Sequence, residues 1–343
     1  MSSEFQLIDD LAAIFRGKHS AVQTGIGDDC AVLEVDGATL LLTIDAFVED
    51  VHFRREFASP RVLGSRAAAA ALSDIAAMGG EATALLVTAA LGPAWSPADA
   101  REIATGIAAR ASAAGAAVIG GDTTASPGPL FVDIAVLGRI PPGGRAVRRA
   151  GAQVGDVLAV TGTPGEAGLG LRHLLGQLQG ELTLSPDEAE RVVARHLDPT
   201  PRLREGRLLA GCAEVHAMID ISDGLGQDAG HLARAAGLGV MLDIDSLPCD
   251  PALVGLRTRA LKEWTAAALG GGEDYELALA LAPAAIAEIS ARLLDETGTR
   301  LTVVGRFEPS GPDGPSVRLR DGTRVDGLGW EHLGQDGKKK DVL

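Results

Sequence analysis

The chain has 343 residues, of which 46% are hydrophobic and only 3% aromatic, so its length suits two globular domains with aliphatic cores. Its net charge of −15 argues against nucleic-acid binding, which depends on Lys and Arg neutralising phosphates. Three scattered cysteines, no uncharged apolar run of about 18 residues and no signal-peptide pattern lead us to expect no disulfide framework, no membrane span and a cytoplasmic location.

The first part of the chain alternates helical and strand patterns. Helical spacing predicts a helix at residues 4–16, and the apolar runs GIGDDCAVLEV and TLLLTIDAFV predict a hairpin around Asp36–Gly37. Helices are expected at 60–78 and 97–114, and strands at ATALLVTAALG, AAVIGGDT and LFVDIAVLGRI. This order predicts an α/β sandwich of the ferredoxin-like kind for residues 1–140.

The second part repeats the α/β pattern after a crossing rich in Gly, Pro and Arg at 141–156. VLAVTGTP predicts a strand, 165–178 a helix, and 186–211 mostly helix with a break at Pro199 and Pro201. MIDISDG ends a strand, a helix follows at 224–237, and GVMLDID, YELALAL and LTVVGRF predict three more strands. A second α/β domain is therefore expected at 141–333, followed by a frayed polar tail at 334–343.

The chemical signal is a set of aspartates at strand ends or in glycine turns. They are Asp28, Asp29, Asp45, Asp74, Asp122, Asp220 and Asp223. Ionised carboxylates beside apolar runs are costly unless they are paired or bind a cation, and no matching Lys or Arg lies in the same segments. Alone, Asp29 could cap the following segment and Asp74 could lie on an exposed helix face. Together they predict a Mg²⁺ site, because Mg²⁺ prefers oxygen ligands.

Eight motifs in a fixed order carry a family resemblance. They are GIGDDCAV, TIDAFVEDVHF, LSDIAAMGG, IGGDTT, TGTPG, HLDPTPR, MIDISDGL and GGGEDYEL. This set resembles the thiamine-monophosphate kinase family, within the superfamily of aminoimidazole ribonucleotide synthetase, selenophosphate synthetase and a hydrogenase-maturation carbamoyl dehydratase. The resemblance implies a first domain that pairs across a homodimer as a shared sheet or barrel. It also implies a second domain of the aminoimidazole ribonucleotide synthetase type, with ATP and metals between the two.

The activity implied by the resemblance is ATP-dependent phosphorylation of thiamine monophosphate to thiamine diphosphate, by in-line transfer assisted by several Mg²⁺ ions. The implied metal ligands are Asp28, Thr43, Ile44, Asp45, Asp74, Asp122, Asp220 and Asp223. The implied ATP contacts are Gly121, Asp122, Arg149 and Ser222, and the implied acceptor-site residues are His52, Glu273 and Trp330. No general base is assigned, because the acceptor phosphate is already an anion. A requirement for a monovalent cation stays open.

Some of these residues also allow a purely structural interpretation when each is taken alone. His52 could be an ion-paired surface histidine, Trp330 could seal the last strand, and Glu273 could cap the segment after it. The TGTPGEAG segment could help to cover phosphates or be a plain strand-to-helix turn. Some relatives place a tyrosine before the GGDTT strand, whereas this chain has ASAAGAAV there, so aromatic contact with adenine from that segment is lost.

Four alternative functions compete with the kinase. Aminoimidazole ribonucleotide synthetase shares the aspartates, but VHF and GGEDYEL fit it less well. Selenophosphate synthetase and the hydrogenase-maturation type would each need a functional Cys near one end, where this sequence has none. A non-catalytic acidic metal- or nucleotide-binding protein is disfavoured by the retained aspartate set.

Overall fold

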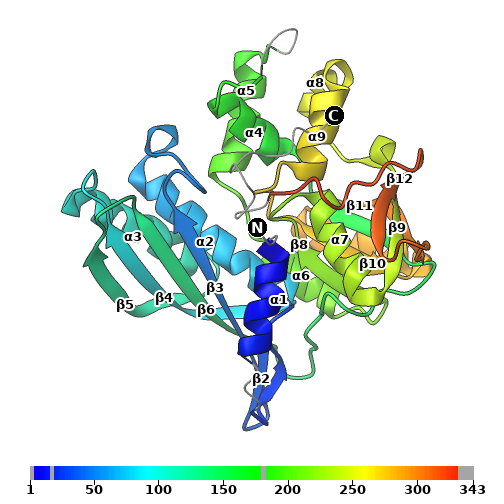
Figure 1. Cartoon of the computed structure of the whole chain (residues 1–343), viewed down its shortest axis with the longest axis horizontal. Helices are drawn as coiled ribbons and strands as arrows, with labels where there is room; N and C mark the ends of the chain where they lie inside the picture. The colour runs from blue at the N-terminus through cyan, green and yellow to red at the C-terminus, as the bar shows by residue number, and fades with distance from the viewer. Residues whose placement is uncertain (1–3, 16–18, 179–182, 331–343) are drawn as a thin grey trace.

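A computed structural model describes residues 4–15, 19–178 and 183–330. This part of the chain forms two six-stranded sheets with helices packed on them, joined by residues 140–156, which contain no helix or strand (Figure 1). The expected α/β fold is confirmed, since each of the two α/β parts contributes one sheet with its helices. Within the described ranges, no helix is long and apolar enough to cross a membrane. The predicted tail at 334–343 lies outside the described residues, and the domain boundary after residue 140 stays a prediction.

The first sheet has the strand order β1-β2-β3-β6-β4-β5, in which only β4 and β5 pair in parallel. Its strands are β1 (Val22–Thr24), β2 (Ala31–Val35), β3 (Ala38–Val48), β4 (Glu81–Leu91), β5 (Ala117–Ala125) and β6 (Phe131–Arg139). Helix α1 (Glu4–Ile14) precedes it, and α2 (Pro60–Ala77) and α3 (Pro97–Ala113) cover one face. The predicted hairpin is confirmed, because β2 and β3 are antiparallel around Asp36–Gly37, whose φ angles are both positive.

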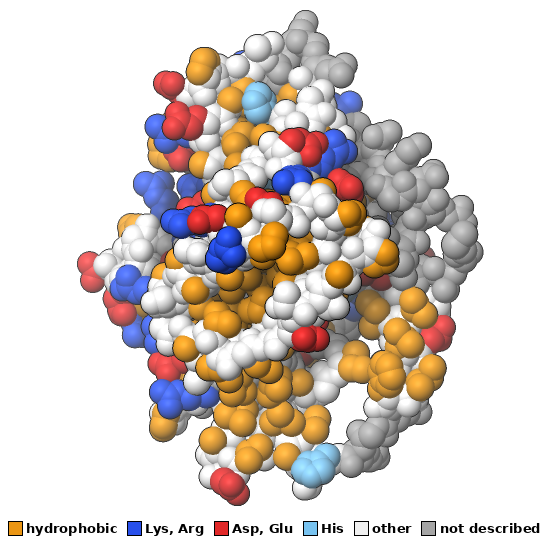
Figure 2. Space-filling model, turned by 90° about the vertical axis from the view of Figure 1, so that its left-hand side faces the viewer, with side chains coloured by type: hydrophobic (Ala, Val, Ile, Leu, Met, Phe, Trp, Pro, Cys, Tyr) orange, Lys and Arg blue, Asp and Glu red, His pale blue; other side chains and the backbone are white. Residues whose placement is uncertain are grey.

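The opposite face of the first sheet is open and apolar. Ile44 on β3 and Leu86 on β4 both pair with Ala135 of β6, so their side chains point to the same face. They are 66% and 49% exposed, and Ile119 of β5 is 65% exposed. Hydrophobic side chains gather on the side of the molecule where this sheet lies (Figure 2). Proteins that work as monomers rarely expose a contiguous apolar patch of this kind.

The second sheet has the order β12-β9-β11-β7-β10-β8, with β9 and β12 parallel and the other neighbours antiparallel. Its strands are β7 (Val157–Thr161), β8 (Val215–Asp220), β9 (Leu238–Leu242), β10 (Leu277–Leu281), β11 (Leu301–Pro309) and β12 (Ser316–Leu319). Its helices are α4 (Glu166–Leu174), α5 (Pro186–Leu197), α6 (Leu203–Ala210), α7 (Leu225–Ala236), α8 (Val254–Arg259), α9 (Leu261–Gly270) and α10 (Ile286–Thr297). Helix α7 packs on one face, while α6 and α10 pack on the other.

Several elements were not expected from the sequence. Helices α8, α9 and α10 and the short strands β1 and β12 lie in segments to which the sequence analysis assigned no element. Helix α10 is amphipathic, with Ile289 and Leu293 buried one turn apart, so its pattern was readable. Strand β12 has only four residues and is defined by its pairing with β9, which no local pattern specifies.

Helix α2 links the two halves of the molecule. Its second half is rich in alanine, which lets α6 approach closely. A side chain on Gly206 of α6 would place its Cβ 2.1 Å from the carbonyl oxygen of Ala76. Next to this contact, Arg207 forms an ion pair with Glu81 at 2.9 Å. The close approach fixes Asp74, two residues before Ala76, opposite the end of strand β8.

A candidate active site between the two sheets

Carboxylates from both halves of the chain converge at this junction. Asp29 precedes β2, Asp74 lies on α2 and Asp220 ends β8. Each offers a carboxylate oxygen, and these three oxygens lie within 4.8 Å of one another. Thr43 of β3 joins them, because its hydroxyl donates a short hydrogen bond to Asp74 Oδ2. We call Asp29, Asp74 and Asp220 the central cluster.

The electrostatics of the central cluster are those of a site that needs positive charge. Burial, followed by the charge of Asp29, raises the pKa of Asp220 to about 7. Burial together with Glu273 and Asp133 raises the pKa of Asp45 to about 7. The pKa of Asp74 is raised well above its usual value by burial and by Asp220 and Asp45. A divalent cation would offset this repulsion, whereas protonation alone would leave the acids neutral.

Arg149 compensates one of these charges. Its guanidinium donates to Asp29 Oδ1 at 2.6 and 3.2 Å, and its backbone N–H donates to the carboxylate of Asp28 at 3.3 Å. Asp29 therefore does not act as a cap, since its carboxylate binds a side chain 120 positions away. Burial and Asp29 still raise the pKa of Asp28 to about 6. No sequence pattern predicts this pairing, because Arg149 lies in the crossing segment rather than near the aspartates.

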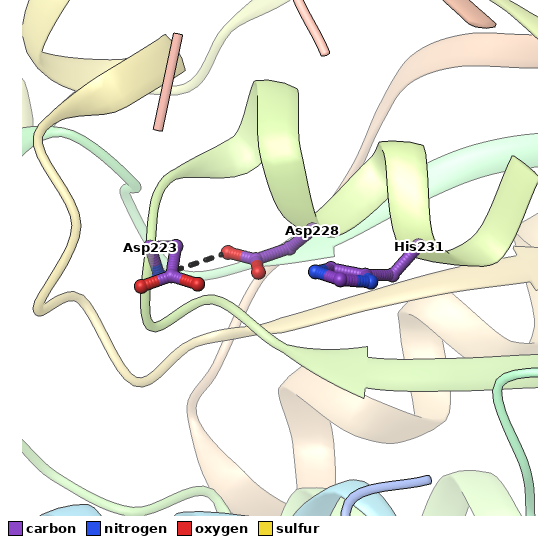
Figure 3. Close-up of side chains that lie close together, drawn as sticks. All are labelled: Asp223, Asp228 and His231. Atoms are coloured by element: carbon purple, nitrogen blue, oxygen red, sulfur yellow. Dashed lines mark hydrogen bonds between the residues drawn. The ribbon is translucent and has the colours of Figure 1, made fainter. Parts of the chain in front are cut away.

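A second group lies around the start of helix α7 (Figure 3). Asp223, Asp228 and His231 each offer one ligand atom, and these atoms lie within 4.8 Å of one another. Asp228, in the first turn of α7, accepts the backbone N–H groups of Asp223 at 3.2 Å and Gly224 at 3.0 Å, so it fixes the loop that leads into the helix. Burial and the charges of Arg149 and Arg234 lower the pKa of His231 to about 3, which keeps the ring neutral. Of these three residues the motifs predicted only Asp223 as a ligand, although Asp228 and His231 show the i, i+3 spacing of one helix face.

The three predicted acceptor residues lie near this second group. The N–H of Glu273 donates to the Ser222 carbonyl at 2.8 Å, and the N–H of Trp330 donates to the Asp223 carbonyl at 3.3 Å. Arg66 of α2 connects His52 to Glu273. Its guanidinium donates to the backbone carbonyl of His52 at 3.1 Å and to the carboxylate of Glu273 at 2.5 Å. Ser222, Asp223, His52, Glu273 and Trp330 are thus brought into one region.

The loop that carries Glu273 has an unusual backbone. Glu273 and Tyr275 have φ angles of 66° and 51°, a left-handed conformation that costs side-chain-bearing residues about 1–3 kcal/mol each. Gly272 is also left-handed, and a side chain there would place its Cβ 2.5 Å from the Ser222 carbonyl oxygen. Two hydrogen bonds to residues 221 and 222 hold this conformation. Such strain is typical of functional sites, where it fixes the direction of a side chain.

Two predicted site residues lie apart from the central cluster. Gly121 and Asp122 are on β5, with β4 and β6 between them and β3. Across the sheet from β5 to β3, the directly paired residues are Asp122, Thr88, Asp133 and Ala46. Side chains of directly paired residues point to the same face, so Asp122 lies on the open face together with Ala46. Asp45 points to the other face of the sheet. Ile44 likewise has its side chain on the open face, so only its backbone could serve the cluster.

The glycine-rich TGTPGEAG segment does not present an open anion site. The carboxylate of Asp274 accepts the N–H of Gly165 at 2.9 Å and that of Ala167 at 3.3 Å. A buried carboxylate therefore occupies the amide groups at the start of α4, where a phosphate would otherwise bind. This favours the plain strand-to-helix turn over a phosphate-covering role.

Comparisons with known proteins agree with this architecture. The family model for the AIR synthase related protein, N-terminal domain, matches residues 27–140, and that for the C-terminal domain matches 153–317. The thiamine-monophosphate kinase of Salmonella typhimurium is 36% identical over 96% of this chain and 98% of its own length. That of Bacillus subtilis is 35% identical over 76% of this chain and 78% of its own length.

Solved structures give the same answer. AaThiL complexed with AMPPCP and TMP is 30% identical over 96% of this chain and 97% of that chain, with a TM-score of 0.80. Thiamine-monophosphate kinase from Stenotrophomonas maltophilia is 34% identical over 92% of this chain and 96% of that chain, with a TM-score of 0.72. E. coli HypE, at 23% identity and a TM-score of 0.65, shares the fold. From its two AIR synthase related domains and these near full-length matches, the chain belongs to the thiamine-monophosphate kinase family.

Proposed function

We propose that this chain is an ATP-dependent kinase that converts thiamine monophosphate into thiamine diphosphate by direct in-line phosphoryl transfer. The observation that carries the proposal is the near full-length likeness to AaThiL complexed with AMPPCP and TMP, which holds an ATP analogue and the acceptor together. The convergence of acidic residues and acceptor-site candidates at one junction supports the same reaction.

We propose that the central cluster and its neighbours hold several Mg²⁺ ions. The proposed ligands are Asp28, Thr43, Ile44, Asp45, Asp74, Asp122, Asp220 and Asp223. The donor set fits, because carboxylates and a hydroxyl meet within a few ångströms, and burial together with neighbouring carboxylates raises the pKa values of Asp45 and Asp220. Asp29 belongs to the cluster by distance, but its pairing with Arg149 favours an indirect role. Bound magnesium would neutralise phosphate charge and align the two phosphates.

The ATP side is assigned to Gly121, Asp122, Arg149 and Ser222. Arg149 supports this role, because it is a cation beside the central cluster. Ser222 supports it through its place between Asp220 and Asp223, in the loop that Asp228 fixes. For Gly121 and Asp122, which lie apart from the cluster within one chain, the role requires the open faces of two subunits to pair. A homodimer is therefore part of the proposal, and the exposed Ile44, Leu86 and Ile119 support it.

The acceptor side is assigned to His52, Glu273 and Trp330. Burial alone would raise the pKa of Glu273, but Arg66 and the nearby His196 and His52 lower it, so the group is an anion. An anionic carboxylate suits the cationic thiazolium ring, and an indole can stack on the same ring. The chain's own task is to bind and orient two phosphates, since the acceptor phosphate needs no general base.

Product analysis tests the proposal. The purified chain is incubated with ATP, Mg²⁺ and thiamine monophosphate, with parallel tubes for free thiamine, formylglycinamidine ribonucleotide, chelator, and K⁺ replaced by Na⁺. Thiamine diphosphate and ADP in equal amounts, absent with chelator, are the expected result. Turnover of the purine precursor instead would assign the chain to the aminoimidazole ribonucleotide synthetase reaction. The cation exchange decides whether a monovalent ion is required.

A further inference from the structure

We propose that Arg66 is a positioning residue of the acceptor site, which holds Glu273 and the His52 segment together across the two domains. The inference rests on the proposed function, since it concerns how the same site receives its acceptor. It names a residue that the sequence motifs did not single out, in the middle of helix α2.

The burial of Arg66 is the first argument. The residue is 1% exposed and directly precedes the alanine run 67–71 of α2, although a buried guanidinium is costly unless it is paired. Its Cζ lies 5.3 Å from the centre of the Phe47 ring, which leaves the planar group little freedom to turn. An arginine on the surface would not pay this desolvation cost. We therefore expect the buried guanidinium of Arg66 to make a contact that requires an arginine at this position.

The partners of Arg66 are the second argument. Nη1 donates to the His52 carbonyl at 3.1 Å, and Nη2 donates to Glu273 Oε2 at 2.5 Å, across 207 positions of sequence. The ring of His52 is fixed in turn, because its Nδ1 accepts the Val48 N–H at 3.0 Å. One guanidinium therefore sets the distance between two acceptor-site residues that come from different domains.

The orientation of Glu273 is the third argument. The Tyr275 hydroxyl donates to the same Oε2 at 3.1 Å, so the side-chain hydrogen bonds found within the described residues all fall on that oxygen. The backbone of Glu273 is held in its left-handed conformation by the Ser222 carbonyl. With Oε2 tied down, Oε1 is the oxygen left to face a ligand, and the side chain is 18% exposed. Arg66 thus presents one oxygen of an ionised carboxylate to a cationic acceptor.

The experiment compares steady-state constants and acceptor binding in Arg66→Met and Arg66→Lys. We expect Arg66→Met to raise the KM for thiamine monophosphate by about tenfold or more, because truncating one partner of a buried charge pair is costly. The KM for ATP should stay within about twofold, and calorimetric binding of thiamine monophosphate should weaken by the same factor as its KM. The matched control is Arg207→Met, which removes a second Arg–Glu pair between the domains, the one with Glu81, and should change neither constant.

Arg66→Lys decides the matter if the methionine variant does not fold. Lysine keeps the charge but cannot hold His52 and Glu273 with one planar fork, so a rise of several-fold in the acceptor KM alone is expected. Wild-type constants in Arg66→Lys, or an equal rise in both KM values, would overturn the inference. If wild-type protein does not phosphorylate thiamine monophosphate at all, the proposed function fails instead, which the unmodified chain reveals on its own.

Discussion

The substitution Asp74→Asn should slow phosphoryl transfer by orders of magnitude and, in the absence of metal, stabilise the fold. The carboxylate oxygens of Asp74, Asp29 and Asp220 lie within 4.8 Å of one another. Two unit charges at that distance repel by about 3.5 kcal/mol for an effective dielectric constant of about 20. Since burial and the charges of Asp220 and Asp45 raise the pKa of Asp74, protonation already relieves part of this repulsion. A gain of about 1–3 kcal/mol in the free energy of unfolding remains.

The same change removes a proposed metal ligand while keeping the shape of the side chain. Asparagine retains an oxygen that can accept the hydrogen bond from Thr43. Losing several kcal/mol of charge stabilisation should lower kcat/KM on the order of a thousandfold. ADP release with saturating Mg²⁺ measures the activity, and thermal unfolding in chelator measures the stability.

The matched control is Asp36→Asn in the exposed turn between β2 and β3, where φ is 49° and asparagine is well tolerated. Asp36→Asn should change neither the activity with Mg²⁺ nor the stability in chelator. Normal turnover in Asp74→Asn would refute the metal-cluster account. A lower melting temperature in chelator would refute the electrostatic reasoning, because it would mean that the charge of Asp74 stabilises the metal-free fold.

The buried acids, the β4–β5 contact and the open face of the first sheet lead to three more predictions. Asp28, Asp45 and Asp220 have pKa values raised from 3.8 to about 6, 7 and 7, so the metal-free folded state binds more protons than the unfolded state from about pH 4 to pH 7. The free energy of unfolding measured in chelator should therefore fall as pH rises through that window, and Mg²⁺ should restore it at pH 8. A calorimetric stability that does not change with pH would contradict this prediction. Gly121→Ala places a Cβ 1.8 Å from the Val87 carbonyl oxygen at a φ of 152°, so the melting temperature of this variant should fall by several degrees. The control is Gly311→Ala, because Gly311 has open space around it. Equal melting temperatures for the two variants would count against the β4–β5 geometry. Leu86→Glu on the open face should convert a dimer into a monomer in light-scattering chromatography, whereas Leu294→Glu on α10 should not; an unchanged dimer mass in Leu86→Glu would rule out pairing through that face.

The sequence predicted features that depend on neighbours along the chain. The hairpin around Asp36–Gly37 and helices α2 and α3 arise from local periodicity and capping, and the structure confirms them. Aspartates within or beside apolar segments predicted that acidic groups would meet, and Asp74 of α2 and Asp220 at the end of β8 do so.

Contacts between distant segments could not be predicted from the sequence. Arg149 with Asp29 and Arg66 with Glu273 join residues 120 and 207 positions apart, and only the packing of α2 between the domains brings the second pair together. The face of a strand also matters. Asp122 was grouped with Asp45 by motif, yet strand order and pleat place them on opposite faces of the sheet.

The most direct test of the central claim traces the γ-phosphate of ATP. The chain is incubated with ATP labelled at that phosphate, Mg²⁺ and thiamine monophosphate, and the products are separated. The account predicts one labelled thiamine diphosphate for each ADP formed, with the label in its terminal phosphate. Label released only as inorganic phosphate, with thiamine monophosphate unchanged, would contradict it.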